Sequence, residues 1–207
     1  MKKSIVITIN RQYGSGGHLI GKKVAEKLGI PFYDKELLTL AASESGFAKE
    51  TFEHNDEHVR LSTSYLSAIG VILGSPTANL VDLSLNDQLQ MIQSKVIEEI
   101  ANKGSCVIVG RCADYVLRDR ENLLSIYIHA DDEDRTLRIV NEYQACSEEE
   151  AEAMIKKMDK QRSNYYNFYS NQKWNSAKTY DLTLNSSYFG IEGCVDLICE
   201  VAKRKSE

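Results

Sequence analysis

Apolar positions along the chain follow two different periods. Short, nearly continuous apolar runs predict buried strands, and apolar residues recurring every three or four positions predict helices between them. The predicted strands are Ile5–Ile9, Phe32–Tyr33, Cys106–Val109, Leu123–Ile128 and Asp181–Leu184. The helical stripes are Ile20, Val24 and Leu28; then Leu85, Leu89, Ile92, Val96 and Ile100; then Ile191, Val195, Ile198 and Ala202. This alternation predicts an α/β fold with a doubly wound, mainly parallel sheet covered by helices on both faces.

Two segments depart from this alternation. Residues 47–83 mix polar residues with a patchy apolar run. Residues 131–178 begin with four acidic residues, which suit a helix N-terminus, and Ser147-x-x-Glu150 is a capping box that predicts a second, longer helix. That helix then turns basic. Its charges are those of Lys156, Lys157, Asp159, Lys160, Arg162 and, beyond it, Lys173.

Composition limits the classes of function. The 207 residues are 43% hydrophobic and 27% charged, which is enough for a sizeable core, and the net charge of −5 argues against a general nucleic-acid-binding surface. No apolar run approaches the roughly 20 residues of a membrane span, and Met1–Ser4 leads directly into the first strand rather than into a secretory signal. We therefore expect a cytoplasmic protein that binds neither nucleic acid nor a membrane. The five cysteines contain no C-x-x-C pair, so neither a disulfide framework nor a protein metal site is predicted.

A glycine-rich turn lies between the first predicted strand and the first helix. Glycines let the chain bend so that successive backbone N–H groups point inward, and the positive end of the following helix adds to the attraction for phosphate. A plain βα turn is the alternative, but three glycines among four positions favour a phosphate site. The predicted phosphate-binding residues are Gly14, Ser15, Gly16, Gly17 and His18.

This turn departs from the P-loop pattern G-x-x-x-x-G-K-[ST]. When the two are aligned on Gly16, Arg11 occupies the leading glycine position, Gly17 the lysine position and His18 the hydroxyl position. The P-loop lysine normally reaches the β- and γ-phosphates, and the hydroxyl binds Mg²⁺. We predict that Arg11 supplies the missing charge, because residues at strand ends point toward the crevice at the carboxyl edge of the sheet.

Four stretches together resemble the cytidylate kinase-like family of P-loop nucleoside monophosphate kinases. They are Arg11–Gly17, Gly29–Leu37, Gly110–Tyr115 and Asp159-x-x-Arg162-x-x-Tyr165-Tyr166. The resemblance spans nearly the whole chain and implies a five-stranded parallel sheet, a helical insertion that binds the monophosphate acceptor, and a lid. Within one domain we assign residues 1–46, 84–130 and 179–207 to the core, residues 47–83 to the acceptor-binding insertion, and residues 131–178 to the lid.

The acceptor side of the resemblance rests on three residues. Arg111 follows the third strand, and its guanidinium matches a monophosphate in bidentate fashion; the alternative is an ion pair with Asp114. Asp34 follows the second strand and suits a base amino group or ribose hydroxyl, but it suits equally well the cap of a helix starting near Lys35. Asp159, in the shared Asp-x-x-Arg motif, is assigned to the acceptor as well. Similar kinases carry Gly-Arg-Asp at this strand end, where their acid is related to Mg²⁺, whereas in this chain the acid is displaced to Asp114.

The lid side of the resemblance rests on arginines. Arg135 and Arg138 share one helix face, and with Arg162 they are predicted to surround the transferring phosphoryl group. The alternative is surface pairing, of Arg135 with Asp131 or Asp132 and of Arg138 with Asp134 or Glu142. The aromatic run Tyr165, Tyr166, Phe168, Tyr169 and Trp174 is interpreted as packing of the lid helix onto the core, with Tyr166 as the one candidate for base stacking.

The resulting hypothesis is phosphoryl transfer from ATP, with Mg²⁺, to a nucleoside monophosphate. The preference for cytidylate rests on the resemblance alone. Two alternatives stay open: a small-molecule kinase with another acceptor, and a nucleotide- or phosphate-binding module without transferase activity. Residues 47–83 are compatible with an acceptor lid or a dimer arm, so a homodimer is also considered.

Overall fold

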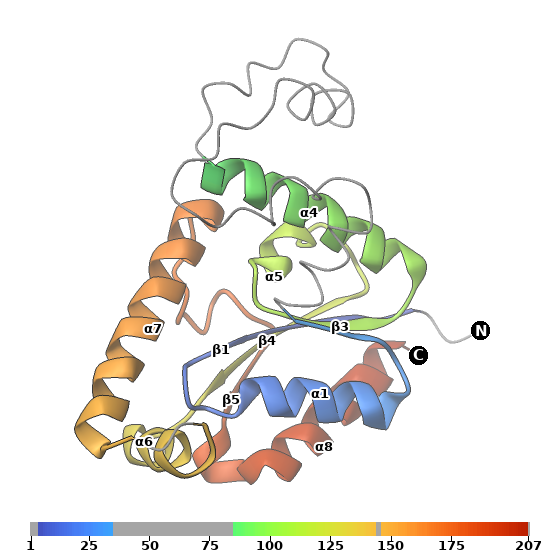
Figure 1. Ribbon diagram of the computed structural model, residues 1–207. Coiled ribbons are helices and arrows are strands. Elements are labelled where there is room, and N and C mark those ends of the chain that lie inside the picture. The colour runs from blue at the N-terminus through green and yellow to red at the C-terminus, as the bar shows by residue number, and fades with distance from the viewer. Residues whose placement is uncertain (1–3, 35–84, 144–145, 207) are drawn as a thin grey trace.

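The computed structural model describes residues 4–34, 85–143 and 146–206. Within these residues, five parallel strands form one sheet in the order β2-β3-β1-β4-β5 (Figure 1). The strands are β1 (Val6–Arg11), β2 (Phe32–Tyr33), β3 (Cys106–Val109), β4 (Leu123–His129) and β5 (Leu182–Asn185). The predicted parallel α/β sheet is confirmed, and each predicted strand lies within two residues of its observed position.

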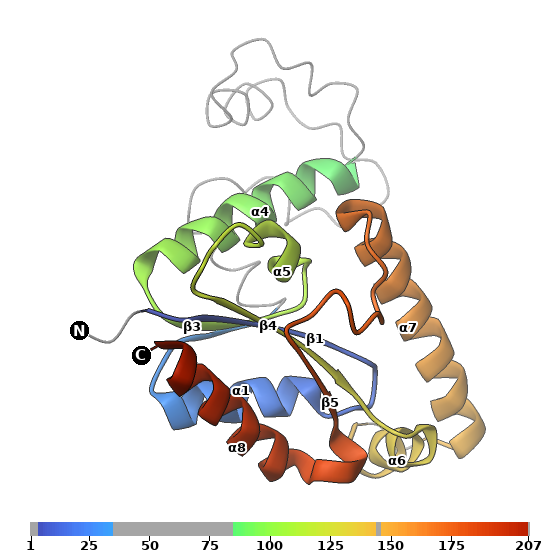
Figure 2. The ribbon, with the colours of Figure 1, turned by 180° about the vertical axis from the view of Figure 1, so that it is seen from behind.

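Helices cover both faces of the sheet. Figures 1 and 2 show α1 (Gly17–Leu28) and α8 (Ser186–Ser206) on one face, and α4 (Leu85–Lys103) with the short α5 (Ala113–Val116) on the other. The three helices predicted from the apolar stripes are thus confirmed as α1, α4 and α8. Helix α8 is bent at Gly190, whose φ of 69° and ψ of 171° are not helical.

The core is built by the alternation of side chains along the strands. Ile7 and Ile9 of β1 face α1 and α8, whereas Val6 faces α4, and all three are fully buried. Burying a side chain of this size contributes about 1.5–3 kcal/mol. The central position of β1 therefore anchors the segment that follows it, which is the glycine-rich turn.

The segment assigned to the lid consists of two helices joined by a π-helical turn. Helix α6 (Asp132–Arg138) opens with three acidic residues, the turn spans Ile139–Tyr143, and α7 (Glu148–Ser170) follows. The predicted capping box is present, since the Ser147 hydroxyl accepts from the Glu150 N–H and the Glu150 carboxylate accepts from the Ser147 N–H. This box defines where α7 begins, and α7 then runs beside one end of the sheet (Figure 1).

Two predicted features fall outside the described residues, and one prediction is corrected. The insertion assigned to residues 47–83, and the helix near Lys35 that Asp34 was to cap, lie outside the described residues. The packing expected of the aromatic run is wrong for Phe168, whose side chain is 73% exposed, but Tyr166 and Trp174 are buried. All five cysteines are free thiols. Among the described residues, no helix is long and apolar enough to span a membrane.

Candidate active site

The candidate site lies where β1 and β3 end. These two strands are neighbours in the sheet. Helix α1 leads from β1 to β2, and β2 lies on the far side of β3, whereas β4 lies on the other side of β1. Ligands bind at such a switch point, outside the carboxyl ends of parallel strands. Here it brings Arg11, at the end of β1, close to Gly110 and Arg111, which follow β3.

The glycine-rich turn adopts a conformation that glycine permits. Gly14 and Gly16 have φ of 79° and 76°, in the left-handed region. The Ser15 hydroxyl and N–H both donate to the Gln12 carbonyl, at 2.8 and 3.3 Å, so this side chain is turned inward. Ile20 N–H donates to the Gly16 carbonyl, which starts α1. The first N–H groups of α1 have no acceptor within the helix, and Gly16 provides no side-chain cap for them, so they are available to an anion.

A cavity of about 290 Å³ lies at the end of β1, where this turn begins, and none of Gly14–His18 lines it. Its walls come from the end of β1, the residues after β3, one face of α7 and Trp174. Three arginines contribute to them, Arg11, Arg111 and Arg162, and each comes from a different segment of the chain. The remaining lining residues include Asn10, Gly110, Cys112, Met158, Gln161, Tyr165 and Tyr166.

The cavity carries excess positive charge. Among the described residues, no carboxylate lies within 4 Å of the guanidinium of Arg11, Arg111 or Arg162, although other arginines have such partners. Burial, followed by the charges of Arg162 and Arg111, lowers the pKa of Arg11 to about 9, which leaves it protonated at neutral pH; Asp34 and Asp159 partly oppose this shift. Burial also lowers the pKa of Arg162. Three neighbouring cations of this kind suit an anionic ligand such as phosphate.

Arg111 is presented by a left-handed turn. Three consecutive residues, Gly110, Arg111 and Cys112, have φ of 79°, 59° and 53°, and Ala113 N–H closes the turn onto the Gly110 carbonyl at 3.2 Å. Residues other than glycine pay for this conformation with roughly 1 kcal/mol or more, and such strain is concentrated at functional sites. The Arg111 guanidinium lies 5.6 Å from the ring centroid of Tyr165, so a cation–π contact helps to hold it at the cavity.

Asp114 holds two residues of the cavity wall, Asn10 and Tyr166, by hydrogen bonds. Its carboxylate accepts from the Asn10 amide at 2.9 Å and from the Tyr166 hydroxyl at 2.5 Å. The ion pair considered between Arg111 and Asp114 does not form. Burial raises the pKa of Asp114, and the hydrogen bonds from Tyr166 and Asn10 lower it in part. Tyr166 is buried in one aromatic cluster with Trp174 and Tyr180, and its hydroxyl donates to Asp114, so its ring is not exposed for base stacking.

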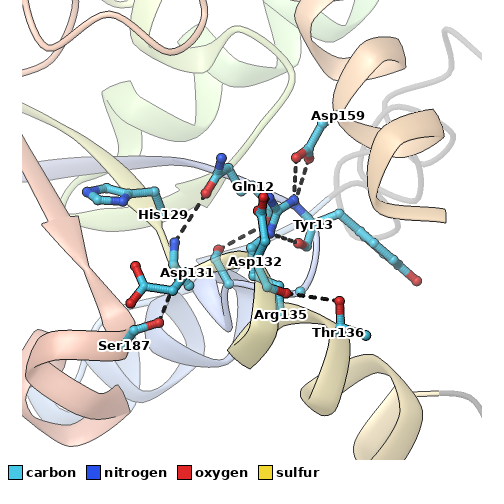
Figure 3. A network of polar contacts seen from close by, with 12 residues as sticks. Gln12, Tyr13, His129, Asp131, Asp132, Arg135, Thr136, Asp159 and Ser187 are labelled. Carbon is cyan, nitrogen blue, oxygen red and sulfur yellow. Dashed lines mark hydrogen bonds and ion pairs between the residues drawn. The ribbon is translucent and has the colours of Figure 1, made fainter. Parts of the chain in front are cut away.

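A second polar network holds the turn against the helices of the lid segment. Figure 3 shows Asp159 reaching from α7 toward Arg135 of α6 and the backbone of Tyr13. Tyr13 N–H donates to Asp159 Oδ1 at 2.8 Å, Arg135 Nε donates to the Tyr13 carbonyl at 2.7 Å, and Arg135 Nη2 pairs with Asp159 Oδ2. Arg135 also pairs with Asp132 at 2.8 Å and is only 3% exposed. The pairing considered between Arg135 and Asp132 therefore exists: the arginine is buried, whereas the Asp132 side chain is 87% exposed.

The other predicted residues lie around the turn. Arg138 Nη1 donates to the Gly14 carbonyl at 2.5 Å, and Arg138 Nε lies 4.0 Å from Glu142. His18 Nε2 lies 2.9 Å from Asp34 Oδ2, and the His18 side chain is 54% exposed. The structure thus gathers Arg11, Arg111 and Arg162 at the cavity. It does not bring Arg135, Arg138 and Asp159 there, since they contact the backbone of the turn.

Sequence reasoning overlooked several contributors to the site. Asn10 holds Asp114, Tyr165 contacts Arg111, and Gly110 borders the cavity. Asn10 directly precedes Arg11 and Gly110 directly precedes Arg111, so the same strand-end rule could have identified both. Among the described residues, no three His, Cys, Asp or Glu side chains gather in a way that could hold a metal ion.

The parallel sheet in this strand order, with a glycine-rich turn between its central strand and the next helix, defines the fold of the P-loop kinases. A solved shikimate kinase from Bacteroides thetaiotaomicron has the same fold, with a TM-score of 0.53 and 14% identity over 95% of this chain and 97% of that one. The model of the cytidylate kinase-like family matches residues 6–188, and the chain belongs to that family.

Individual relatives agree with this assignment. The cytidylate kinase of Archaeoglobus fulgidus is 26% identical over 202 residues, which cover 96% of this chain and 95% of that protein. The cytidylate kinase of Pyrococcus horikoshii is 26% identical over 199 residues, or 95% of this chain and 88% of that protein. The crystal structure of an uncharacterized protein from Eubacterium ventriosum is similar with a TM-score of 0.72 and 32% identity, covering 96% of this chain and 98% of that one.

Proposed function

We propose that this kinase-family protein transfers a phosphoryl group from ATP to a nucleoside monophosphate, with cytidylate as the first acceptor to test. The observation that carries the proposal is the convergence of Arg11, Arg111 and Arg162 on one cavity at the end of β1, where the glycine-rich turn begins. Membership of the cytidylate kinase-like family and the two cytidylate kinases among its relatives support the choice of acceptor.

In this proposal the two anionic substrates meet at the end of β1. The N–H groups of Gly14–His18 bind the donor phosphates, and Arg111 binds the phosphate of the acceptor in bidentate fashion. Arg11 and Arg162 lie between these positions and stabilise the negative charge on the transferring group. The reaction needs little acid–base chemistry from the protein, because alignment and neutralisation of charge supply most of the catalysis.

The lid residues take a different part from the one their sequence positions suggested. Arg135 and Asp159 neutralise each other and hold Tyr13, so in this proposal they set the shape of the turn rather than contact the substrates. Arg138 remains beside the donor phosphates, since its guanidinium donates to the Gly14 carbonyl and its Cζ lies 3.7 Å from where a Cβ of residue 16 would be. Asp34 is proposed to contact the acceptor's base or ribose, with His18 as its neighbour.

Mg²⁺ is included in the proposal as part of the donor. Mg²⁺ usually keeps several waters and is bound by substrate phosphates together with one or two carboxylates, so in this proposal the ion arrives with ATP. When bound, the ion neutralises charge on the β- and γ-oxygens.

The test is a direct assay of phosphorylated product with ATP and each of CMP, dCMP, UMP, AMP and GMP. We expect a diphosphate product with at least one pyrimidine monophosphate. Replacing Arg111 with alanine should lower kcat/KM for the acceptor about 10- to 100-fold, which corresponds to the loss of a charged hydrogen bond. Arg204→Ala, at an exposed position on α8, is the matched control and should leave kcat/KM unchanged. ATP binding without product from any of these acceptors would reject the proposal and favour a binding module.

A further inference from the structure

The lysine position of the P-loop pattern is a glycine in this chain, and the structure gives a reason. A Cβ added at Gly17 would lie 2.5 Å from Cβ of Arg11, 3.0 Å from its Cγ and 3.3 Å from Cβ of Ile128. Gly17 opens α1 and is not one of the glycines with positive φ, so its backbone would accept alanine. The position lacks a side chain because the aliphatic part of Arg11 occupies the space.

The other end of the Arg11 side chain rests against a second glycine. A Cβ added at Gly110 would collide with Nη1 of Arg11 and would lie 3.4 Å from its Cζ and 3.6 Å from its Nη2. Gly110 follows β3, whereas Gly17 opens the helix after β1, so the two glycines come from separate loops. Together they leave room for an extended arginine between the two strand ends.

We infer that Gly17 and Gly110 are positioning residues that form a slot for Arg11. The slot, defined by these two glycines, holds the stem of Arg11 against α1 and its guanidinium at the cavity. This inference rests on the proposed function, in which an arginine from β1 takes the place of the lysine that other P-loop kinases supply from the helix.

The electrostatics of the cavity explain why Arg11 needs such a slot. The charges of Arg162 and Arg111 oppose the charge of Arg11, while Asp34 and Asp159 attract it without forming an ion pair within 4 Å. An unconfined side chain would relieve the repulsion by turning to solvent, since its neighbours are cations of fixed position. Arg162 also donates to the Arg11 carbonyl at 3.0 Å, which fixes the backbone from which the side chain departs. Close packing on both glycines then confines the side chain to the space between the two strand ends.

The test compares Gly110→Ala with Gly29→Ala. Both positions have a positive φ, of 79° and 65°, so alanine brings similar backbone strain to each, but a Cβ at Gly29 meets no atom within 4 Å. A second pair avoids positive φ altogether. Gly17→Ala is compared with Gly193→Ala in α8, where the new methyl makes an ordinary contact at 3.5 Å with Cβ of Phe189.

The measurement is the Kd of inorganic pyrophosphate, obtained by calorimetric titration. We expect Gly110→Ala and Gly17→Ala to raise this Kd about tenfold, the loss of one charged contact, while Gly29→Ala and Gly193→Ala leave it unchanged. In an Arg11→Ala background, where Arg111 and Arg162 retain residual binding, Gly110→Ala should have no further effect. Equal weakening in both backgrounds would mean that the methyl blocks the anion directly, and would overturn the inference. An unchanged Kd for Gly110→Ala and Gly17→Ala in the protein that retains Arg11 would also overturn the inference.

A stability measurement keeps the inference testable if pyrophosphate binding is weak. In urea unfolding, Gly110→Ala should lower the unfolding free energy more than Gly29→Ala does, and this difference should disappear in the Arg11→Ala background. If the effects of Gly110→Ala and Arg11→Ala on the unfolding free energy are purely additive, the inference is overturned. Neither measurement requires turnover. If no nucleoside monophosphate is phosphorylated and the dependence on Arg11 still holds, the proposed function fails and the slot stands.

Discussion

Replacing Arg11 with methionine should stabilise the protein in the absence of an anion. Methionine keeps the unbranched stem that packs on Gly17 and removes the charge. Burial and the neighbouring arginines lower the pKa of Arg11 well below its ordinary value, to about 9. At about 1.4 kcal/mol for each pKa unit, the cost of holding this charge has an upper limit of about 5 kcal/mol. Because Arg11 borders the cavity and is only partly buried, solvent screens part of that cost, and we expect a gain of about 1–3 kcal/mol.

The assay is thermal unfolding with and without pyrophosphate. In a chain of this length, each kcal/mol shifts the midpoint by about 2–4 °C, so a gain of about 2 kcal/mol raises the Tm by about 4–8 °C. Pyrophosphate should raise the Tm of the wild type more than that of Arg11→Met, because the variant binds it more weakly and the stabilisation by a ligand grows with its affinity for the folded state. Arg204→Met, on the exposed face of α8, is the control that should change neither value.

The buried charge of Arg11 also determines the direction in which the unfolding free energy changes with pH. The folded-state pKa of Arg11 lies below the unfolded value, so between about pH 9 and the ordinary pKa of arginine the unfolded chain binds more protons and the unfolding free energy rises with pH. Below about pH 9 the full cost is present. Arg11→Met should lack this rise. A lower Tm for Arg11→Met without anion would refute the reasoning, because it would mean that Asp34 and Asp159 already neutralise the guanidinium.

Three further predictions concern the surroundings of the turn. Asp159→Ala leaves the buried Arg135 without its main partner and should lower the unfolding free energy in urea by about 3 kcal/mol. Gly16→Ala places a methyl against Ile191 at a φ of 76°, so it should abolish pyrophosphate binding in calorimetry, and Ile191→Ala should restore part of it. Burial raises the folded-state pKa of Asp114, so the unfolding free energy of the wild type, measured against Asp114→Asn, should fall as the pH rises from 3.8 through that raised pKa.

Each of these predictions has an outcome that contradicts it. Unchanged stability of Asp159→Ala would show that Asp132 alone suffices for Arg135. Normal pyrophosphate binding by Gly16→Ala would mean that the anion does not depend on the shape of the turn. A stability difference at Asp114 that does not vary with pH would show that its hydrogen bonds offset the cost of burial completely.

The fold could be predicted because its signals are local. Continuous apolar strands, apolar stripes and the capping box at Ser147 each occupy a few consecutive turns or residues, and the five strands and helices α1, α4, α7 and α8 follow from them. The prediction ended β1 at Ile9, where the apolar run stops, but β1 continues to Arg11 because Asn10 and Arg11 pair with Tyr127 and Ile128 of β4. Backbone pairing with a neighbouring strand extends a strand past its last apolar residue, and the sequence of one strand alone does not reveal it.

The candidate site was predictable only in part. Strand ends and glycines identified Arg11, Arg111 and the turn, because parallel strands bring their carboxyl ends to one edge. The partner of Arg135 was not predictable, since Asp159 lies on another helix and helical spacing relates only residues of the same helix. The same limit explains Phe168: its spacing from Tyr165 shows which residues share a face, but not that this part of the face is open to solvent.

The bonds that hold Tyr13 have a consequence for how the protein is made. Tyr13 is separated along the chain by 122 positions from Arg135 and by 146 from Asp159, so the turn is synthesised long before the residues that fix it. Closing such long loops is slow compared with forming local helices. A nascent chain that has completed β1 and α1 therefore still lacks a finished anion site. The recovery of pyrophosphate binding during refolding should report the docking of α7, one of the last steps of assembly, rather than the appearance of secondary structure.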